Sequence, residues 1–266
     1  MDAHCHLQDN KIFADHKNLI ENANAIGIKY MVCCATHEKD FNKVKKLSVQ
    51  YNSIIPSYGI HPWFVENLSC EWEKNLIGVL ESEKTKSNKR YTPGIGETGL
   101  DFAINNYNSA LQEKIFTDQL IIAKEMNIPI SIHIRKAWDV FIHIIKKTGH
   151  LRAGGLIHSY SGSPDMIPLF EKYGLYISFS GSITRPGTKK VIKALEIVSD
   201  DKMLIETDSP YIMPSILSKN KNNNINKPEN LVLIADIASQ IRKIPVKEYG
   251  TKTFNNGVRL FKIPEN

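Results

Sequence analysis

Short apolar runs alternate along the chain with longer segments in which apolar residues recur at helical spacing. The short runs are largely uncharged and rich in β-branched residues, a pattern typical of buried strands. The intervals between them, about 22–36 residues, match the length of one strand followed by one helix. We predict eight strands, at residues 1–6, 29–36, 54–61, 91–97, 128–134, 153–158, 174–181 and 202–208.

Capping residues mark several helix ends. Ser109 followed by Gln112 forms a capping box ahead of a helical apolar repeat. Ser163 and Pro164 give an N-cap with proline at the first helical position. The segment 127–129 (Asn-Ile-Pro) ends one helix before the next strand begins.

Uncharged strands that are each followed by a helix indicate a parallel sheet covered by helices, and eight such units indicate a closed barrel. We therefore predict an α/β fold: a single-domain (β/α)8 TIM-like barrel spanning residues 1–266, with the active site at the C-terminal ends of the strands. A doubly wound open sheet is the alternative, but it usually has fewer strands, and neither GxGxxG nor a P-loop motif occurs. The Asn/Lys-rich stretch 219–227 is interpreted as a flexible loop.

Composition narrows the setting of the protein. Hydrophobic residues make up 42% and charged residues 23%, as in ordinary globular proteins. The four cysteines form no CxxC pair, so a disulfide framework or cysteine zinc cluster is not indicated. No signal peptide or membrane span is recognised, and we expect a cytoplasmic monomer without a membrane partner. The net charge of +6 suits an anionic substrate such as nucleic acid, although lysine is spread along the chain.

Metal-ligand residue types gather where the predicted strands end. In a barrel these ends meet at one mouth. Because alternate residues of a strand share a face, His4 and His6 can both point into the mouth while Cys5 faces the helices. One such residue is more often a packing or capping residue, but their coincidence at most strand ends predicts a metal site. The residues are His4, His6, His61, Glu97, His133, His158, Glu206 and Asp208.

The number of these residues predicts more than one ion. Four histidines with two carboxylates exceed what one tetrahedral ion needs. We expect two divalent ions sharing a carboxylate and a water, which would lower the pKa of that water and neutralise charge on a phosphoryl or carbonyl oxygen. Nitrogen ligands favour Zn, Mn or Co, whereas Mg prefers oxygen, so the choice among Mg, Mn and Zn stays open.

These residues also stand in an ordered series of motifs that resembles the TatD family of metal-dependent deoxyribonucleases, within the amidohydrolase-like barrels. The series covers nearly the whole chain: DAHCHL at 2–7, GIHP at 59–62, GIGETGLD at 94–101, IHIR at 132–135, IHSYSG at 157–162 and ETDSPY at 206–211.

The resemblance implies a role for each residue. His4, His6 and Asp208 would hold one metal, Glu97 would bridge, and His133 and His158 would hold the second. His61 would contact the scissile phosphate and Glu206 would support the site, so that Asp208, Glu97 and His61 form the catalytic set. Family members are described as magnesium-dependent nucleases that trim DNA from the 3′ end, and some as aminoacyl-tRNA deacylases.

The sequence departs from the family series in segments that would meet the substrate. Trp63 stands where many relatives carry a second histidine, and Ser159 and Tyr160 replace the usual Cys-Phe after the histidine. Thr98 replaces an isoleucine of the glutamate motif. None of these changes removes a predicted ligand.

Several residues have two interpretations. Asp208 is either the general base or only a ligand. Arg135 binds a substrate phosphate or pairs with Asp139, while Asp101 is expected to orient a histidine. The aromatic residues near strand ends stack on bases or wall the pocket; they are Trp63, Phe64, Tyr160 and Tyr211. Lysines 219, 221 and 227 contact a DNA backbone or are solvated.

The sequence leaves three hypotheses for function. The first is a deoxyribonuclease of 3′–5′ exonuclease type, acting on single-stranded DNA or on 3′ ends with a metal-activated water. The alternative is a metal-dependent ester or amide hydrolase, such as an aminoacyl-tRNA deacylase or a small-molecule amidohydrolase. The third is a binding or scaffold protein that has lost turnover, against which the intact ligand set argues.

Overall fold

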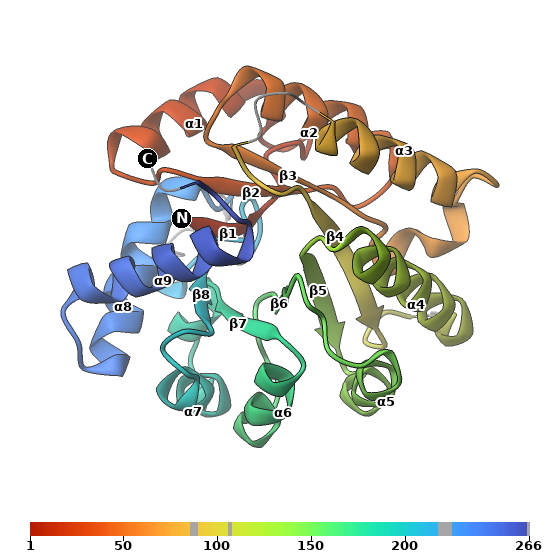
Figure 1. Cartoon of the computed structure of the whole chain (residues 1–266). Helices are drawn as coiled ribbons and strands as arrows, with labels where there is room; N and C mark the ends of the chain where they lie inside the picture. Colours follow the sequence, from red (N-terminus) through yellow and green to blue (C-terminus); the bar gives the residue numbers. More distant parts are fainter. Residues whose placement is uncertain (86–89, 106–107, 218–224, 265–266) are drawn as a thin grey trace.

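The computed structural model describes residues 1–85, 90–105, 108–217 and 225–264. Eight parallel strands follow one another around the sheet in chain order, with helices on the outside (Figure 1). The fold is therefore the TIM-like (β/α)8 barrel predicted from the sequence. The strands are β1 (Asp2–Cys5), β2 (Met31–Cys34), β3 (Ile54–Tyr58), β4 (Gly94–Asp101), β5 (Ile130–Arg135), β6 (Gly155–Ile157), β7 (Leu175–Phe179) and β8 (Met203–Ile205).

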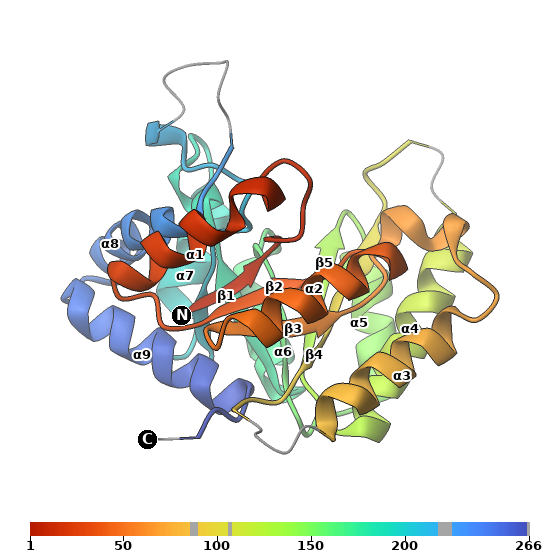
Figure 2. The same ribbon diagram turned by 90° about the horizontal axis from the view of Figure 1, so that it is seen from above.

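Helices follow the strands and surround the sheet, with α8 and α9 on one side of the barrel and α3 and α4 on the opposite side (Figure 2). A short 3-10 helix, η2 (Pro62–Asn67), directly follows His61. The α-helices are α1 (His16–Ala25), α2 (Glu38–Gln50), α3 (Trp72–Lys84), α4 (Ser109–Met126), α5 (Trp138–Thr148), α6 (Ile167–Lys172), α7 (Lys189–Ile197), α8 (Leu231–Arg242) and α9 (Val246–Leu260).

Hydrogen bonds between β1 and the segment after β8 close the barrel. The amide of Asp208 donates to the carbonyl of His4 at 3.0 Å, and the amide of His6 donates to the carbonyl of Ser209 at 2.7 Å. Below them, the fully buried carboxylate of Asp2 accepts bonds from the amide (2.9 Å) and hydroxyl (2.5 Å) of Thr207. The seam between β1 and the segment after β8 is thus made by the backbone of three predicted ligands and by their immediate neighbours in the chain.

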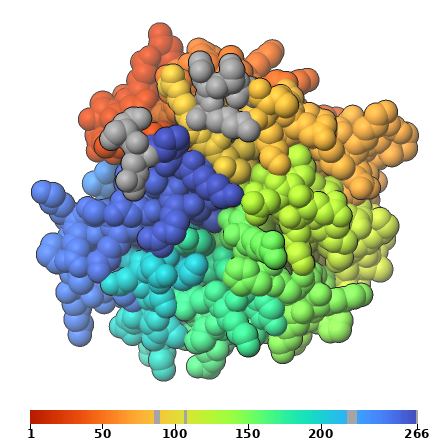
Figure 3. Space-filling view, in the orientation of Figure 1, coloured from red at the N-terminus to blue at the C-terminus, as the bar shows by residue number. Residues whose placement is uncertain are grey.

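The hydrophobic core forms two clusters. The larger lies between the sheet and the helices and contains Cys5, Cys33 and Phe116. The smaller contains a residue from most strands, such as Ala3, Val32 and Leu204, together with Leu260 and Phe261 at the end of α9. In the space-filling view, the dark blue C-terminal part lies between the red-to-orange first third and the cyan-to-green units (Figure 3). Each large apolar side chain buried in this way contributes about 1.5–3 kcal/mol.

One of the predicted capping interactions is wrong. The N-cap of α4 is Asn108, whose side chain accepts a bond from the amide of Leu111 at 3.1 Å. Gln112 does not complete a capping box, because it is buried and bonds the backbone of Asp101 at both ends of its amide (2.8 and 3.2 Å). Gln112 thus provides hydrogen-bond partners for the backbone amide and carbonyl of Asp101 at the end of β4.

The other two predicted helix boundaries are confirmed. Ser163 precedes a short 3-10 helix that begins at Pro164. Asn127 ends α4 in the left-handed conformation, with φ of 52°.

Within the described ranges, no helix combines the length and apolar character needed to cross a membrane. The cytoplasmic location and the monomeric state stay predictions. Of the stretch predicted as a flexible loop, 219–224 falls outside the described residues.

Glycine at position 99 lets β4 pack closely against β5. Gly99 has φ of +147°, and a Cβ built on it would lie 1.9 Å from the carbonyl oxygen of His133, its partner across the ladder. A side chain would therefore push the two strands apart. This close approach holds Glu97 of β4 beside His133 of β5.

We expect Gly99→Ala to lower the free energy of unfolding by about 3 kcal/mol or more, because a strained backbone and an overpacked contact each cost roughly 1–3 kcal/mol. The urea midpoint of the purified variant measures this. Gly250→Ala, in α9, where the added Cβ would meet nothing within 4 Å beyond its chain neighbours and the adjacent backbone of its own helix, is the matched control and should gain roughly 0.5–1 kcal/mol. Equal midpoints for the two variants would contradict the steric account.

Candidate metal centre

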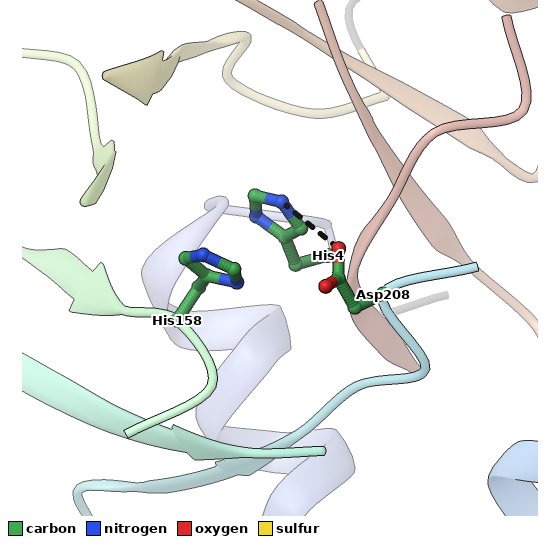
Figure 4. A group of neighbouring side chains, drawn as sticks. All are labelled: His4, His158 and Asp208. Carbon is green, nitrogen blue, oxygen red and sulfur yellow. Dashed lines mark ion pairs between the residues drawn. The ribbon is translucent and has the colours of Figure 1, made fainter. Parts of the chain in front are cut away.

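The predicted ligands converge at the C-terminal mouth of the barrel. Most lie near the end of a strand or within three residues after it, and Glu97 lies in the middle of β4, although the first and the last are about two hundred positions apart in the chain. Figure 4 shows three of them, His4, His158 and Asp208, which come from three different segments and face one another. Nearly all of them are buried. The most exposed of these side chains is that of His133, at 16%.

Glu97 lies at the centre of the cluster, and its two carboxylate oxygens face different histidines. Because one oxygen serves each side, the carboxylate has the position required of a bridge between two cations. Oε2 is 3.5 Å from His4 Nε2 and 3.2 Å from His6 Nε2. Oε1 is 2.9 Å from His133 Nδ1, 3.0 Å from His158 Nε2 and 3.4 Å from His61 Nε2.

Asp208 completes the side of the cluster that faces β1. Its Oδ1 lies 3.2 Å from His6 Nε2 and 3.9 Å from His4 Nε2, the second of which is the dashed contact in Figure 4. The rings of His4 and His158 stack with centroids 4.2 Å apart. The three form one group whose potential ligand atoms lie within 4.8 Å of each other.

Each of the four predicted histidine ligands is anchored through its other ring nitrogen. A neutral imidazole that donates a hydrogen bond outward keeps its lone pair on the inner nitrogen, where a cation can bind. The donor set therefore fits divalent cations. The outer contacts are His4 Nδ1 to Ser131 Oγ (2.7 Å), His6 Nδ1 to the Cys34 carbonyl (2.7 Å), His133 Nε2 to Asp101 Oδ2 (3.3 Å) and His158 Nδ1 to Glu206 Oε1 (3.2 Å).

His61 is arranged in the opposite way. Its Nδ1 accepts a bond from the amide of Trp63 at 3.2 Å, so in the neutral ring the proton is on Nε2, which points at Glu97. Burial lowers the pKa of His61 to about 4, which keeps the ring neutral near pH 7. His61 can therefore donate a hydrogen bond within the site, whereas the other four can offer lone pairs.

The buried carboxylates keep their negative charge because of the histidines. Burial alone would raise the pKa of Glu97, but the neighbouring His61, His158 and His133 hold it well below its usual range. Burial likewise opposes ionisation of Asp208, and the hydrogen bond from His6 outweighs it, so its pKa is lowered.

The pKa values of three histidines, His6, His133 and His158, are raised, which favours protons where cations would bind. Burial opposes protonation of His6, yet its hydrogen bonds to Asp208 and Glu97 raise the pKa to about 10. The pKa of His158 is raised in the same way, against burial, by the charge of Glu97 and by its hydrogen bond to Glu206. Burial and the neighbouring charge of His158 lower the pKa of His4 instead.

The other predicted site residues lie around this cluster. Glu206 is fully buried behind His158 and also accepts a bond from the amide of Ser159 at 2.7 Å, so it reaches the mouth only through His158. Asp101 contacts His133 as expected of an orienting group. Arg135 pairs with Asp101 at 3.9 Å rather than with Asp139.

The aromatic residues divide by exposure. Tyr160 is fully buried against Trp138 and donates its hydroxyl to the carbonyl of Ser163, so base stacking by Tyr160 is wrong and it forms part of the wall. Trp63 and Tyr211 are 51% and 39% exposed and can meet a substrate.

Sequence reasoning missed Ser131, which anchors His4. The sequence pattern could have identified Ser131, because it precedes His133 by two positions on β5 and alternate residues of a strand share a face.

Comparison with known proteins adds a family to this geometry. A family model described as TatD related DNase matches residues 1–262. The chain is 28% identical over 262 residues to an uncharacterized metal-dependent hydrolase, YabD, of Bacillus subtilis, covering 98% of each. It is 28% identical over 275 residues to the human deoxyribonuclease TATDN3, covering 98% of this chain and 94% of that protein. The crystal structure of YJJV, a TatD homolog from Escherichia coli, superposes with a TM-score of 0.89 at 26% identity, covering 99% and 98% of the two chains.

We expect divalent cations to displace protons when they bind. Because the pKa of His6 is about 10, its ring carries a proton near pH 7 when no cation is bound, and the raised pKa of His158 acts in the same direction. Affinity should therefore fall as pH is lowered, by roughly tenfold per unit for each proton released. Calorimetric titration with Mn²⁺ or Zn²⁺ in two buffers of different ionisation enthalpy counts these protons. Binding that is independent of buffer and pH would show that the cation binds elsewhere.

Proposed function

From the membership of this chain in the TatD related DNase family of metal-dependent hydrolases, we propose that it hydrolyses phosphodiester bonds of DNA, removing nucleotides from 3′ ends of single strands. The human relative named a deoxyribonuclease supports DNA as the substrate. The net charge of +6 also favours a polyanion over a small neutral ester.

The proposed site holds two divalent cations. His4, His6 and Asp208 are the ligands of one, His133 and His158 of the other, and Glu97 bridges them. The observation that carries this assignment is the two-sided contact of Glu97 with histidines whose outer nitrogens are already anchored. The cations, which are Mg, Mn or Zn, supply an acidified water and neutralise charge on the phosphoryl group.

The side chains around the cations have separate roles in the proposal. His61 donates its Nε2 proton in a hydrogen bond to a phosphate oxygen, where negative charge develops. Asp208 accepts the proton of the attacking water. Glu206 holds the ring of His158 in orientation, and the exposed guanidinium of Arg135 binds a neighbouring phosphate.

We expect the purified protein to shorten single-stranded DNA in the presence of Mg²⁺, Mn²⁺ or Zn²⁺ and to stop when chelator is added. Oligonucleotides labelled at the 5′ end should give a ladder of shortened products, whereas a 3′ label should appear at once as mononucleotide. His158→Ala should lower the rate by about 10²-fold or more, since it removes a ligand and frees Glu206. Turnover of an aminoacyl ester without cleavage of DNA would instead support the alternative hydrolase.

His61→Ala should separate chemistry from cation binding. We expect its kcat to fall by about 10²-fold, because a hydrogen-bond donor to the developing charge is lost, while its metal content stays that of the unaltered protein. Glu97→Gln should lose both metal and activity. Both variants are tested by measuring kcat and, after gel filtration, the number of metal ions per protein molecule by atomic emission. Loss of metal from the His61 variant would make His61 a ligand.

A further inference from the structure

Trp63 is a large aromatic side chain that stays half exposed beside the cluster. It is 51% exposed, and its ring meets that of His61 with centroids 4.9 Å apart and planes at 85°. His61 thus crosses the indole at nearly a right angle and does not lie flat on it. Exposed apolar residues are common, so exposure alone implies nothing.

A hydrogen bond holds this indole in place. Trp63 Nε1 donates to Asp101 Oδ2 at 2.8 Å, and Asp101 is fully buried with its other oxygen bonded to the amide of Ala103 at 2.9 Å. The amide of Trp63 in turn donates to His61. The ring is therefore held at both its backbone and its nitrogen, and a ring immobilised before binding loses little entropy when a flat ligand stacks on it.

A positively charged side chain, Arg135, lies near the same carboxylate. The guanidinium of Arg135, whose side chain is 57% exposed, is 3.9 Å from the same Asp101 oxygen that accepts from Trp63. An anchored aromatic ring and an exposed guanidinium beside one atom match the two halves of a nucleotide, the base and the phosphate.

Resting on the proposed function, we propose that Trp63 is the base-binding platform of the site, on which the base next to the cleaved phosphodiester stacks while Arg135 binds the adjoining phosphate. The chain then recognises its substrate as a nucleotide and not only as a phosphate ester. Stacking of this kind is tolerant of sequence, because every base offers a flat face.

The test compares two oligonucleotides that differ only at the 3′ residue, which carries either a base or an abasic sugar. Trp63→Ala should lower kcat/KM on the base-bearing substrate by about 10–100-fold, mostly through KM. The decrease in kcat/KM that Trp63→Ala causes on the abasic substrate should be at least about tenfold smaller. Trp63→Phe keeps a ring and lacks the Nε1 donor, so it should retain most of the preference for a base. Val49→Ala, which trims a 67% exposed side chain on α2, serves as the control for loss of surface apolar area.

A binding measurement keeps the inference independent of turnover. Calorimetric affinity for deoxyadenosine monophosphate should exceed that for deoxyribose 5-phosphate by about tenfold in the unaltered protein, and Trp63→Ala should abolish the difference. If the unaltered protein cleaves neither oligonucleotide but keeps this preference, the proposed function fails and the platform stands. Equal affinities, or equal losses on both oligonucleotides together with weaker metal binding, would overturn the platform and leave Trp63 only a support for Asp101 and His133.

Discussion

The negative charge buried on Glu97 is the constraint on which the rest of this structure depends. A carboxylate removed from water is costly unless positive or hydrogen-bonding groups surround it. Here the surrounding groups are imidazoles from four different strand ends. The barrel can satisfy Glu97 only if these strands keep their register, so the site and the register of the sheet are mutually dependent.

The geometry of the mouth is maintained by contacts outside the ligands themselves. Ser131, Asp101 and Glu206 each bind the far nitrogen of a histidine, and each belongs to a strand or to the segment directly after one. Rigid elements fix side chains more accurately than loops do. Changes in the loops, such as those near Trp63 and Ser159, can therefore alter what the mouth receives without displacing the ligands.

Much of the fold could be predicted from the sequence, because the eight strands are buried and their apolar runs are continuous. The convergence of the ligands followed from the topology, since strand ends of a barrel share one mouth. Contacts set by tertiary packing could not be predicted. The sequence predicts Gln112 as a capping residue, but its amide bonds the end of β4, and for Tyr160 the sequence could not decide between base stacking and a buried place in the pocket wall. Periodicity identifies the face of a residue, and not the partner its polar atoms will find.

The seam between β1 and the segment after β8 has a consequence for biosynthesis. Asp2 and Thr207 lie 205 positions apart in the chain. The neighbouring His4 and Asp208 are joined by a backbone hydrogen bond across the same seam. A ribosome would have to translate most of the message before the first histidines met their carboxylate partner. An N-terminal fragment released early would lack β8 and the segment after it, which carries Asp208. Premature termination would therefore yield chains with an incomplete set of predicted ligands.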